Sequence, residues 1–240
     1  MKTSHSPIAL VTGAAKGVGA TIAEQLARDG YTVVVHYHSS TADAERTLKA
    51  IRTHQPASSM IAADIRSQKE RKQLVNLVLK RYGRIDVLVN TVGNFIFTPL
   101  AQTSVDVWRD VLETNLEATM FLSQLVLPQM RKQKYGRIVN FGAVSADRMI
   151  ARPRTTPYYI AKTGVIILTK QLAEDNAKYG ITVNAISPGI LESSVVKLKT
   201  PTGKYIRFND IARTVSFVVQ PESQAINGAN IEVAGGFKFV

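Results

Sequence analysis

The chain has no cysteine, which excludes disulfide bonds and thiolate chemistry. No apolar run approaches the roughly 20 residues that are needed to span a bilayer. Residues Met1 to Pro7 also lack the apolar core of a secretory signal. We therefore expect a cytoplasmic protein with no membrane partner, and nothing in the residue pattern predicts a metal site.

Acidic residues are scarce as well. The 240 residues include 18 Asp and Glu against 30 Lys and Arg, a formal net charge of +12. Such an excess can attract nucleic acid, a membrane surface or an anionic ligand. The basic residues are scattered, however, and no nucleic-acid-binding motif is present. We expect no nucleic-acid partner, because an anionic cofactor with an acidic substrate or carrier explains the positive net charge better.

The remaining composition is globular, with 45% apolar residues and a length that suits one domain. Short runs rich in valine and isoleucine alternate with helical patterns. The predicted strands are Ile8–Val11, Tyr31–His36, Ile85–Asn90, Arg137–Phe141, Thr182–Ile186 and Asn230–Val233. The predicted helices are Gly19–Asp29, Ala42–Arg52, Lys69–Tyr82, Ser104–Gln133 (long enough to contain a break), Tyr158–Tyr179 and Phe208–Val219. Repeated strand–helix units predict a doubly wound parallel α/β sheet of the Rossmann type, in a single domain over residues 1–240.

A glycine-rich loop follows the first predicted strand and opens a helix. From Thr12 to Gly19 it reads Thr-Gly-Ala-Ala-Lys-Gly-Val-Gly. Glycine lets the backbone turn tightly and approach a pyrophosphate, which then meets the free N–H groups and the positive end of the helix. Three glycines in a turn are weak evidence alone. Their position between a strand and a helix favours a dinucleotide-binding loop.

The end of the second predicted strand indicates which dinucleotide binds. NAD sites usually place a carboxylate there to hold the ribose 2′-hydroxyl. From His36 to Ser40 the chain reads His-Tyr-His-Ser-Ser, with no carboxylate, and Lys16 lies in the neighbouring loop. A 2′-phosphate would meet imidazole, hydroxyl and ammonium donors, so we expect NADP(H). The alternative is that these are ordinary solvated residues.

Tyr158 and Lys162 lie four residues apart at the start of a predicted helix, so their side chains share one face. A nearby ammonium lowers the pKa of a phenol from its ordinary value of about 10. The phenol can then pass a proton to a carbonyl oxygen as hydride arrives. A Tyr-x-x-x-Lys pair alone is usually only a surface pair, so it indicates a catalytic pair only in combination with the glycine loop.

Taken together, these motifs resemble the short-chain dehydrogenase/reductase family along nearly the whole chain. The resemblance implies that Tyr158 is the proton donor, Lys162 its partner, and Asn115 the asparagine that supports the lysine through water. It implies that Asp64 holds the adenine ring and Ser193 the nicotinamide amide. The whole implied cofactor site consists of Thr12, Gly13, Ala15, Lys16, Gly17, Val18, Gly19, His36, His38, Ser39, Asp64, Ile65, Asn90, Val92, Gly93, Tyr158, Lys162, Pro188, Gly189, Leu191 and Ser193.

One position of the family is changed in this chain. Members normally carry a serine after the fifth strand that hydrogen-bonds the substrate oxygen. Counting forward from the strand Arg137–Phe141 places it at Ala143, whereas counting back from Tyr158 places it at Ser145. If the strand continued, Ala143 and Ser145 would face the same side. Either Ser145 replaces the serine in catalysis, or the hydroxyl is absent and the enzyme is weak.

Two branches of the family suggest different substrates. The segment Tyr135 to Asn140 and the region of Asn115 resemble the 3-oxoacyl-carrier-protein reductases, which implies a small or carrier-bound carbonyl substrate. Phe95, together with His36 to His38, is similar to the pteridine reductases, which implies a ring C=N substrate stacked on Phe95. Phe95 as a mere packing residue is the alternative. A nucleotide-binding regulator with little turnover also stays open.

Further expectations concern the surroundings of the site. Arg148, Arg152 and Arg154 lie in the loop beside it, and they either meet an acidic carrier or phosphorylated substrate or are solvated. Few residues separate Ser193 from Asp210, so we expect a short lid and a rather open cleft. The resemblance also implies a homo-oligomer, a dimer or tetramer, formed through the two longest predicted helices.

Overall fold

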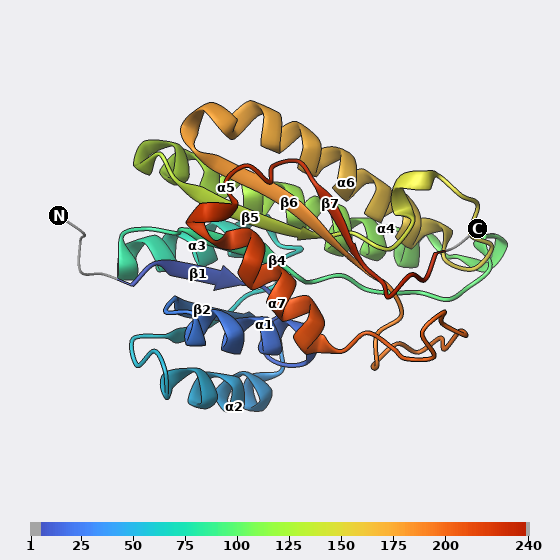
Figure 1. The fold of residues 1–240 in the computed structure, drawn as a ribbon, viewed down its shortest axis with the longest axis horizontal. Coiled ribbons are helices and arrows are strands. Elements are labelled where there is room, and N and C mark those ends of the chain that lie inside the picture. Colours follow the sequence, from blue (N-terminus) through green and yellow to red (C-terminus); the bar gives the residue numbers. More distant parts are fainter. Residues whose placement is uncertain (1–5, 239–240) are drawn as a thin grey trace.

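The structure, a computed structural model, describes residues 6–238, which form a parallel sheet between two layers of helices (Figure 1). Residues 1–5 and 239–240 of the predicted domain lie outside this described part. The seven strands are β1 (Ile8–Val11), β2 (Thr32–Tyr37), β3 (Ser59–Ala62), β4 (Val87–Asn90), β5 (Gly136–Phe141), β6 (Ile181–Pro188) and β7 (Asn230–Val233). Their order is β3-β2-β1-β4-β5-β6-β7, and every neighbouring pair is parallel. The predicted doubly wound, single-domain fold is confirmed.

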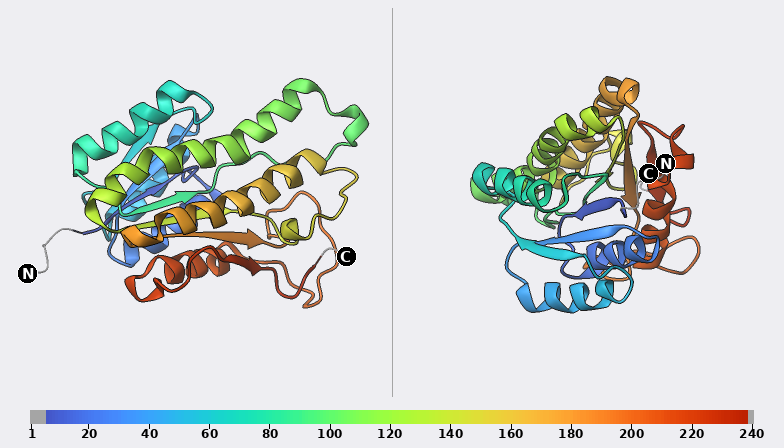
Figure 2. Two further views of the ribbon diagram at one scale, coloured as in Figure 1. Left: turned by 90° about the horizontal axis from the view of Figure 1, so that it is seen from above. Right: turned by 90° about the vertical axis from the view of Figure 1, so that its left-hand side faces the viewer.

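Helices cover both faces of the sheet (Figure 2). The helices are α1 (Gly17–Arg28), α2 (Thr41–Arg52), α3 (Gln68–Tyr82), α4 (Val105–Leu112), α5 (Ala118–Gln133), α6 (Thr156–Asn176) and α7 (Phe208–Val219). One layer contains α1, α2 and α7, and the other contains α3, α5 and α6. Within residues 6–238, no helix combines the length and the apolar character that crossing a bilayer requires.

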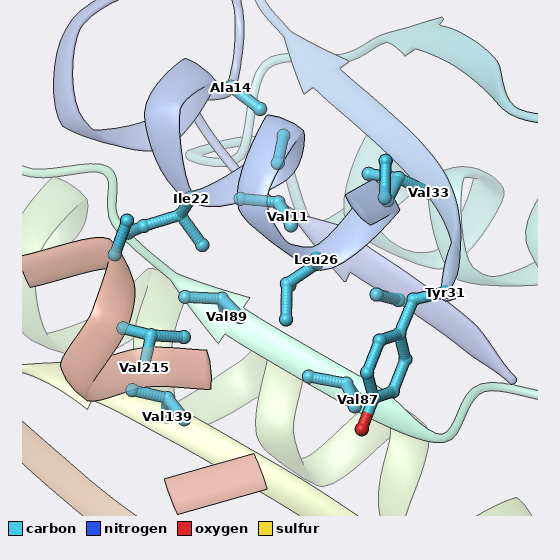
Figure 3. Close-up of a cluster of buried hydrophobic side chains, with 14 of the residues drawn as sticks. Val11, Ala14, Ile22, Leu26, Tyr31, Val33, Val87, Val89, Val139 and Val215 are labelled. Carbon is cyan, nitrogen blue, oxygen red and sulfur yellow. The ribbon is translucent and has the colours of Figure 1, made fainter. Parts of the chain in front are cut away.

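The hydrophobic core lies on both sides of the central strands. On the side of α1 and α7, Leu26 and Val215 pack against Val89 and Val139 of the sheet (Figure 3). These four side chains are at most 1% exposed. The central strands are apolar on both faces because both faces are covered, which is typical of a parallel sheet. This rigid core fixes the positions of the loops at the carboxyl ends of the strands.

The structure differs from the sequence-based prediction in several elements. The strand β3 was not predicted: it has four residues, begins with a serine and lies at the edge of the sheet. The predicted helix Ser104–Gln133 is divided by a π-helical turn, Glu113–Glu117 (η2). Strand β6 runs two residues past its predicted end, to Pro188. Helix α6 begins at Thr156, so Tyr158 lies in its first turn.

Candidate active site

A cavity of about 820 Å³ lies at the carboxyl ends of the strands. In Figure 1 this end is on the right, where the segment after β5 (yellow) and the segment after β6 (orange) emerge. Ligands of doubly wound sheets bind at this edge. The lining includes residues that follow four different strands, among them Val18, Gly93, Phe95, Ala143, Tyr158, Lys162, Pro188 and Gly189.

The predicted phosphate loop connects β1 to α1. Lys16 precedes the helix in an extended conformation, and its side chain does not cap the helix. The loop is tightly packed, because a Cβ atom on Gly19 would lie only 2.4 Å from the carbonyl oxygen of Gly13. No larger residue fits at Gly19 without moving the backbone. A helix N-terminus without a side-chain cap offers its N–H groups to an anion, so the loop fits a pyrophosphate.

His36 has a different role from the one expected of it. Its side chain is 1% exposed. The Gly13 N–H donates to Nδ1 (3.1 Å), and Nε2 lies 2.9 Å from the carbonyl oxygen of Ala63. These partners require a neutral imidazole with its proton on Nε2, and burial lowers the pKa of His36 to about 4. Since both nitrogens are used, His36 supports the glycine loop from beneath and does not face a 2′-phosphate.

The other expected contacts of the 2′-phosphate are accessible. Lys16, His38 and Ser39 are all exposed. Nearby, the Arg66 guanidinium donates to Asp64 (2.8 Å) and also reaches Asp110 (3.2 Å). The hydrogen bonds from Arg66 to Asp64 hold the pKa of Asp64 below its usual value. The Asp64 carboxylate is therefore matched by a cation, which reduces its repulsion of an anionic cofactor.

Tyr158 and Lys162 both line the cavity, as their spacing predicts. Lys162 is 4% exposed, its Nζ donates to the Phe141 carbonyl oxygen (2.8 Å), and it lies 5.4 Å from the centroid of the Tyr158 ring. Burial lowers the pKa of Lys162 to about 7. Burial also raises the pKa of Tyr158, which is opposite to the lowering expected from the ammonium. At neutral pH the phenol is consequently protonated.

Asn115 lies in the π-helical turn, against Lys162 and Gly93. Its Nδ2 donates to the carbonyl oxygens of Asn94 (2.9 Å) and Val111 (3.0 Å), which fixes the orientation of the amide. The Oδ1 atom is buried and accepts no hydrogen bond from any residue in the described range. A Cβ atom on Gly93 would lie 2.2 Å from this Oδ1 and 3.4 Å from Lys162 Nζ. Gly93 therefore leaves the space in which the amide and the lysine approach each other.

Comparison with known proteins identifies the family. Residues 7–203 match the sequence profile of the short chain dehydrogenases. The chain belongs to the short chain dehydrogenase family. It is 36% identical to the 3-oxoacyl-[acyl-carrier-protein] reductase FabG of Staphylococcus aureus (strain Mu50), over 98% of this chain and 99% of that protein. It is 33% identical to the 3-oxoacyl-[acyl-carrier-protein] reductase of Synechocystis, over 98% of both chains. Among solved structures, an actinorhodin polyketide ketoreductase with NADPH superimposes with a TM-score of 0.89, at 32% identity and 98% coverage of both chains.

The structure separates the two candidates for the serine position of the short chain dehydrogenases. Ala143 lines the cavity, and the described residues of the cavity wall do not include Ser145. Ser145 is 0% exposed, has a left-handed backbone (φ 59°), and its N–H donates to Glu232 (2.6 Å). The strand ends at Phe141, so the alternation that would have placed both residues on one side does not continue to Ser145. Of the two positions, Ala143 therefore borders the cavity, whereas Ser145 is buried outside the described lining.

The remaining expected cofactor residues of this short chain dehydrogenase fall into two groups. The first lines the cavity and comprises Val18, Gly93, Pro188, Gly189, Leu191 and Ser193, together with the expected substrate contact Phe95. The second is not among the described lining residues and is held by contacts within the protein; it comprises Thr12, Gly13, Ala15, Ile65, Asn90 and Val92. Gly17 is exposed at the start of α1.

Sequence reasoning missed several lining residues, among them Thr91 and Tyr159. Thr91 follows β4 directly. Its backbone N–H donates to Thr12 Oγ1 (3.1 Å), and its hydroxyl donates to the Thr12 carbonyl oxygen (2.5 Å). Tyr159 packs edge-to-face on Tyr158, with ring centroids 5.6 Å apart. Position at a strand end marks Thr91 as a candidate, whereas nothing in the local pattern distinguishes Tyr159 from a packing residue.

Proposed function

We propose that this short chain dehydrogenase is an NADPH-dependent reductase of a ketone carbonyl, of the kind found in 3-oxoacyl thioesters. The observation that carries the proposal is the meeting of Tyr158 and Lys162 in one cavity with Val18, in the first turn of α1. The full-length similarity to 3-oxoacyl-[acyl-carrier-protein] reductases supports the substrate class. A cytoplasmic location and a homo-oligomeric state, dimer or tetramer, are part of the same proposal.

The residues at the two ends of the site fit a dinucleotide. The loop before α1 would hold the pyrophosphate, and Gly93, Pro188 and Gly189 would border the nicotinamide end. When bound, the reduced nicotinamide supplies the hydride. Similarity to a ketoreductase solved with NADPH, and the absence of a carboxylate from His36 to Ser40, support NADPH over NADH.

Proton transfer is the task of the chain itself. Because burial keeps the Tyr158 phenol protonated, it enters the reaction as a proton donor, which suits carbonyl reduction. The phenolate left behind is stabilised by Lys162, whose Nζ lies 5.4 Å from the ring centroid. With a pKa of about 7, Lys162 can take up or release a proton near neutral pH. The buried Oδ1 of Asn115 is placed to hold a water molecule that resupplies this proton.

The missing hydroxyl at Ala143 lowers the expected rate. Loss of one hydrogen-bond donor at a developing oxyanion typically costs about 10²-fold or more. The cavity then retains Tyr158 as the proton donor, so we expect modest turnover rather than none.

A turnover screen tests the proposal. NADPH oxidation is followed with acetoacetyl thioesters and, for the pteridine-reductase alternative, with dihydropterins. We expect reduction of the thioesters, and Tyr158→Phe should lower kcat by about 10²-fold or more while NADPH binding is nearly unchanged. Turnover of dihydropterins alone would move the assignment to a ring C=N substrate stacked on Phe95, whose ring lies 5.1 Å from that of Tyr158. Equal, negligible turnover by wild type and Tyr158→Phe, with NADPH bound to both, would favour a regulator.

A further inference from the structure

The wall of the candidate active-site cavity has charge of one sign. Arg152, Arg154 and Lys162 line it, and the described lining residues include no Asp or Glu. Two of the three cations come from the segment 142–155 between β5 and α6. Low-dielectric walls strengthen the field of charges that line a cleft and concentrate ligands of the opposite sign. The cavity is therefore suited to an anion beyond the proton-transfer pair.

Arg152 is nine-tenths buried, which is unusual for an arginine that lines a cavity. Its guanidinium lies over the Tyr159 ring, 4.6 Å from the centroid, and burial lowers its pKa. Tyr159 in turn contacts Tyr158, with centroids 5.6 Å apart. Two ring contacts thus link the guanidinium to the proton donor, so an anion bound at Arg152 would share the cavity with a carbonyl at Tyr158.

Arg154 extends the cationic wall to the rim. It is exposed, and its guanidinium lies 5.4 Å from the centroid of the Phe97 ring. The Thr98 N–H donates to the Arg154 carbonyl oxygen (2.8 Å), which ties this loop to the segment that carries Phe95 and Phe97. The backbone contact and the ring contact hold Arg154 beside the cavity.

We propose that Arg152, with Arg154 at the rim, binds an anionic oxygen group of the carbonyl substrate, a carboxylate or a phosphate. The inference rests on the proposed reductase function and specifies its substrate class. Guanidinium binds both groups through paired, charge-assisted hydrogen bonds.

A binding measurement that needs no turnover tests the inference. Acetoacetate and its neutral methyl ester are titrated by calorimetry into wild-type protein saturated with the oxidised dinucleotide, with which a ketone cannot react. We expect the anion to bind roughly 10- to 100-fold more tightly than the ester. Arg152→Gln should remove most of this preference, Arg154→Gln a smaller part, and Arg152→Lys should retain some of it.

Arg148→Gln is the matched control. Arg148 belongs to the same loop but is exposed and is not among the described residues of the cavity wall. It should leave both dissociation constants unchanged. The inference would be overturned by equal affinity of wild type for acetoacetate and its ester together with equal affinity for acetoacetyl-pantetheine with and without its phosphate. Equal loss of preference in Arg148→Gln and Arg152→Gln would also overturn it.

Kinetics with the reduced dinucleotide keep the two proposals separate. If wild type reduces the ester as well as acetoacetate, and Arg152→Gln changes neither kcat/KM, the reductase stands and the anion site is rejected. If the anion is bound selectively but neither compound is reduced, the anion site stands and the reductase function fails. Binding of acetoacetyl-pantetheine with and without its phosphate shows which anionic group is bound. A preference confined to the phosphorylated form identifies a carrier phosphate rather than a substrate carboxylate.

Discussion

The cations and imidazoles near the nucleotide loop act in different ways, although they are close in sequence. Lys16 and His38 are exposed, whereas His36 is buried and hydrogen-bonded through both nitrogens. A histidine at a strand end can thus either contact the ligand or support the glycine loop. Only its burial and partners distinguish these roles, and neither can be deduced from the segment His-Tyr-His alone.

Lys16 should determine the choice of dinucleotide. We expect wild type to bind NADPH at least about tenfold more tightly than NADH, because an ammonium at the loop favours a 2′-phosphate. Lys16→Glu should weaken NADPH binding much more than NADH binding. Fluorescence titration of both cofactors measures this, with Lys16→Gln to separate loss of the cation from added repulsion. Equal or reversed dissociation constants in wild type would disprove the preference.

His36 should make the fold sensitive to acid. Its pKa is about 4 in the folded protein, below the value of about 6.5 expected in the unfolded chain. As the pH falls from 6.5 to 4 the unfolded state binds the proton first, so the contribution of His36 to stability is present above pH 6.5 and is lost toward pH 4. We expect this loss to be about 3 kcal/mol.

Denaturant unfolding between pH 7 and pH 4 measures that loss. Carboxylates titrate in the same range, so the informative quantity is the difference between wild type and His36→Gln. This difference should shrink as the pH falls, because the glutamine has no proton to bind. His54→Gln is the control, because this histidine is exposed and is not among the groups that act on the pKa of His36. A constant difference between wild type and His36→Gln would contradict the role assigned to the buried ring.

At the scale of elements, the active site depends on the π-helical turn Glu113–Glu117 and on the loop after β4. The turn places Asn115 beside Gly93, where a Cβ atom would collide with Oδ1 at 2.2 Å. Gly93→Ala should therefore displace the amide and lower kcat by about tenfold or more, because a misplaced proton relay slows the chemical step.

A double mutant checks this explanation. If Gly93→Ala acts by displacing the Asn115 amide, it should have little further effect in an Asn115→Ala background, where the colliding oxygen is gone. Steady-state kinetics of the two single mutants and the double mutant give the coupling, and circular dichroism confirms that each is folded. Fully additive losses would mean that Gly93 acts through another contact.

The elements also show which features the sequence could predict. Six strands were predicted because continuous apolar runs mark strands that are covered on both faces. The edge strand β3 was not predicted, because Ser59 to Ala62 is short and half-exposed. The π-helical turn has no periodic signature, since Leu112 and Ala118 continue a helical pattern on either side of it.

In the site, too, residues marked by a sequence motif were predicted, and features set by long-range contacts were not. Tyr158, Lys162 and the glycine loop were predicted because motif spacing and strand ends fix their places. The left-handed backbone of Ser145 could not be predicted, because its N–H donates to Glu232, 87 positions away. Contacts across such a separation leave no trace in a single sequence.

At the scale of the whole molecule, the net charge of +12 is the feature that the fold does not explain. The sheet and its two helical layers need no such excess, and few of the basic residues meet an acidic partner within the described range. A long-range field of this sign raises the encounter rate with an acidic macromolecule. It acts weakly on a small uncharged substrate, which carries no charge for the field to attract.

Ionic strength should therefore affect carrier-bound and small substrates differently. If the charge guides an acidic carrier, kcat/KM for the carrier-bound 3-oxoacyl thioester should fall by about tenfold between 0.05 and 0.5 M salt, as the Debye length shrinks. A neutral acetoacetyl thioester of N-acetylcysteamine should change much less over the same range. Because both substrates use Tyr158 and the same cofactor, any salt effect on chemistry or on cofactor binding appears in both and cancels in their ratio. A ratio that stays constant with salt would remove the carrier as the reason for the charge.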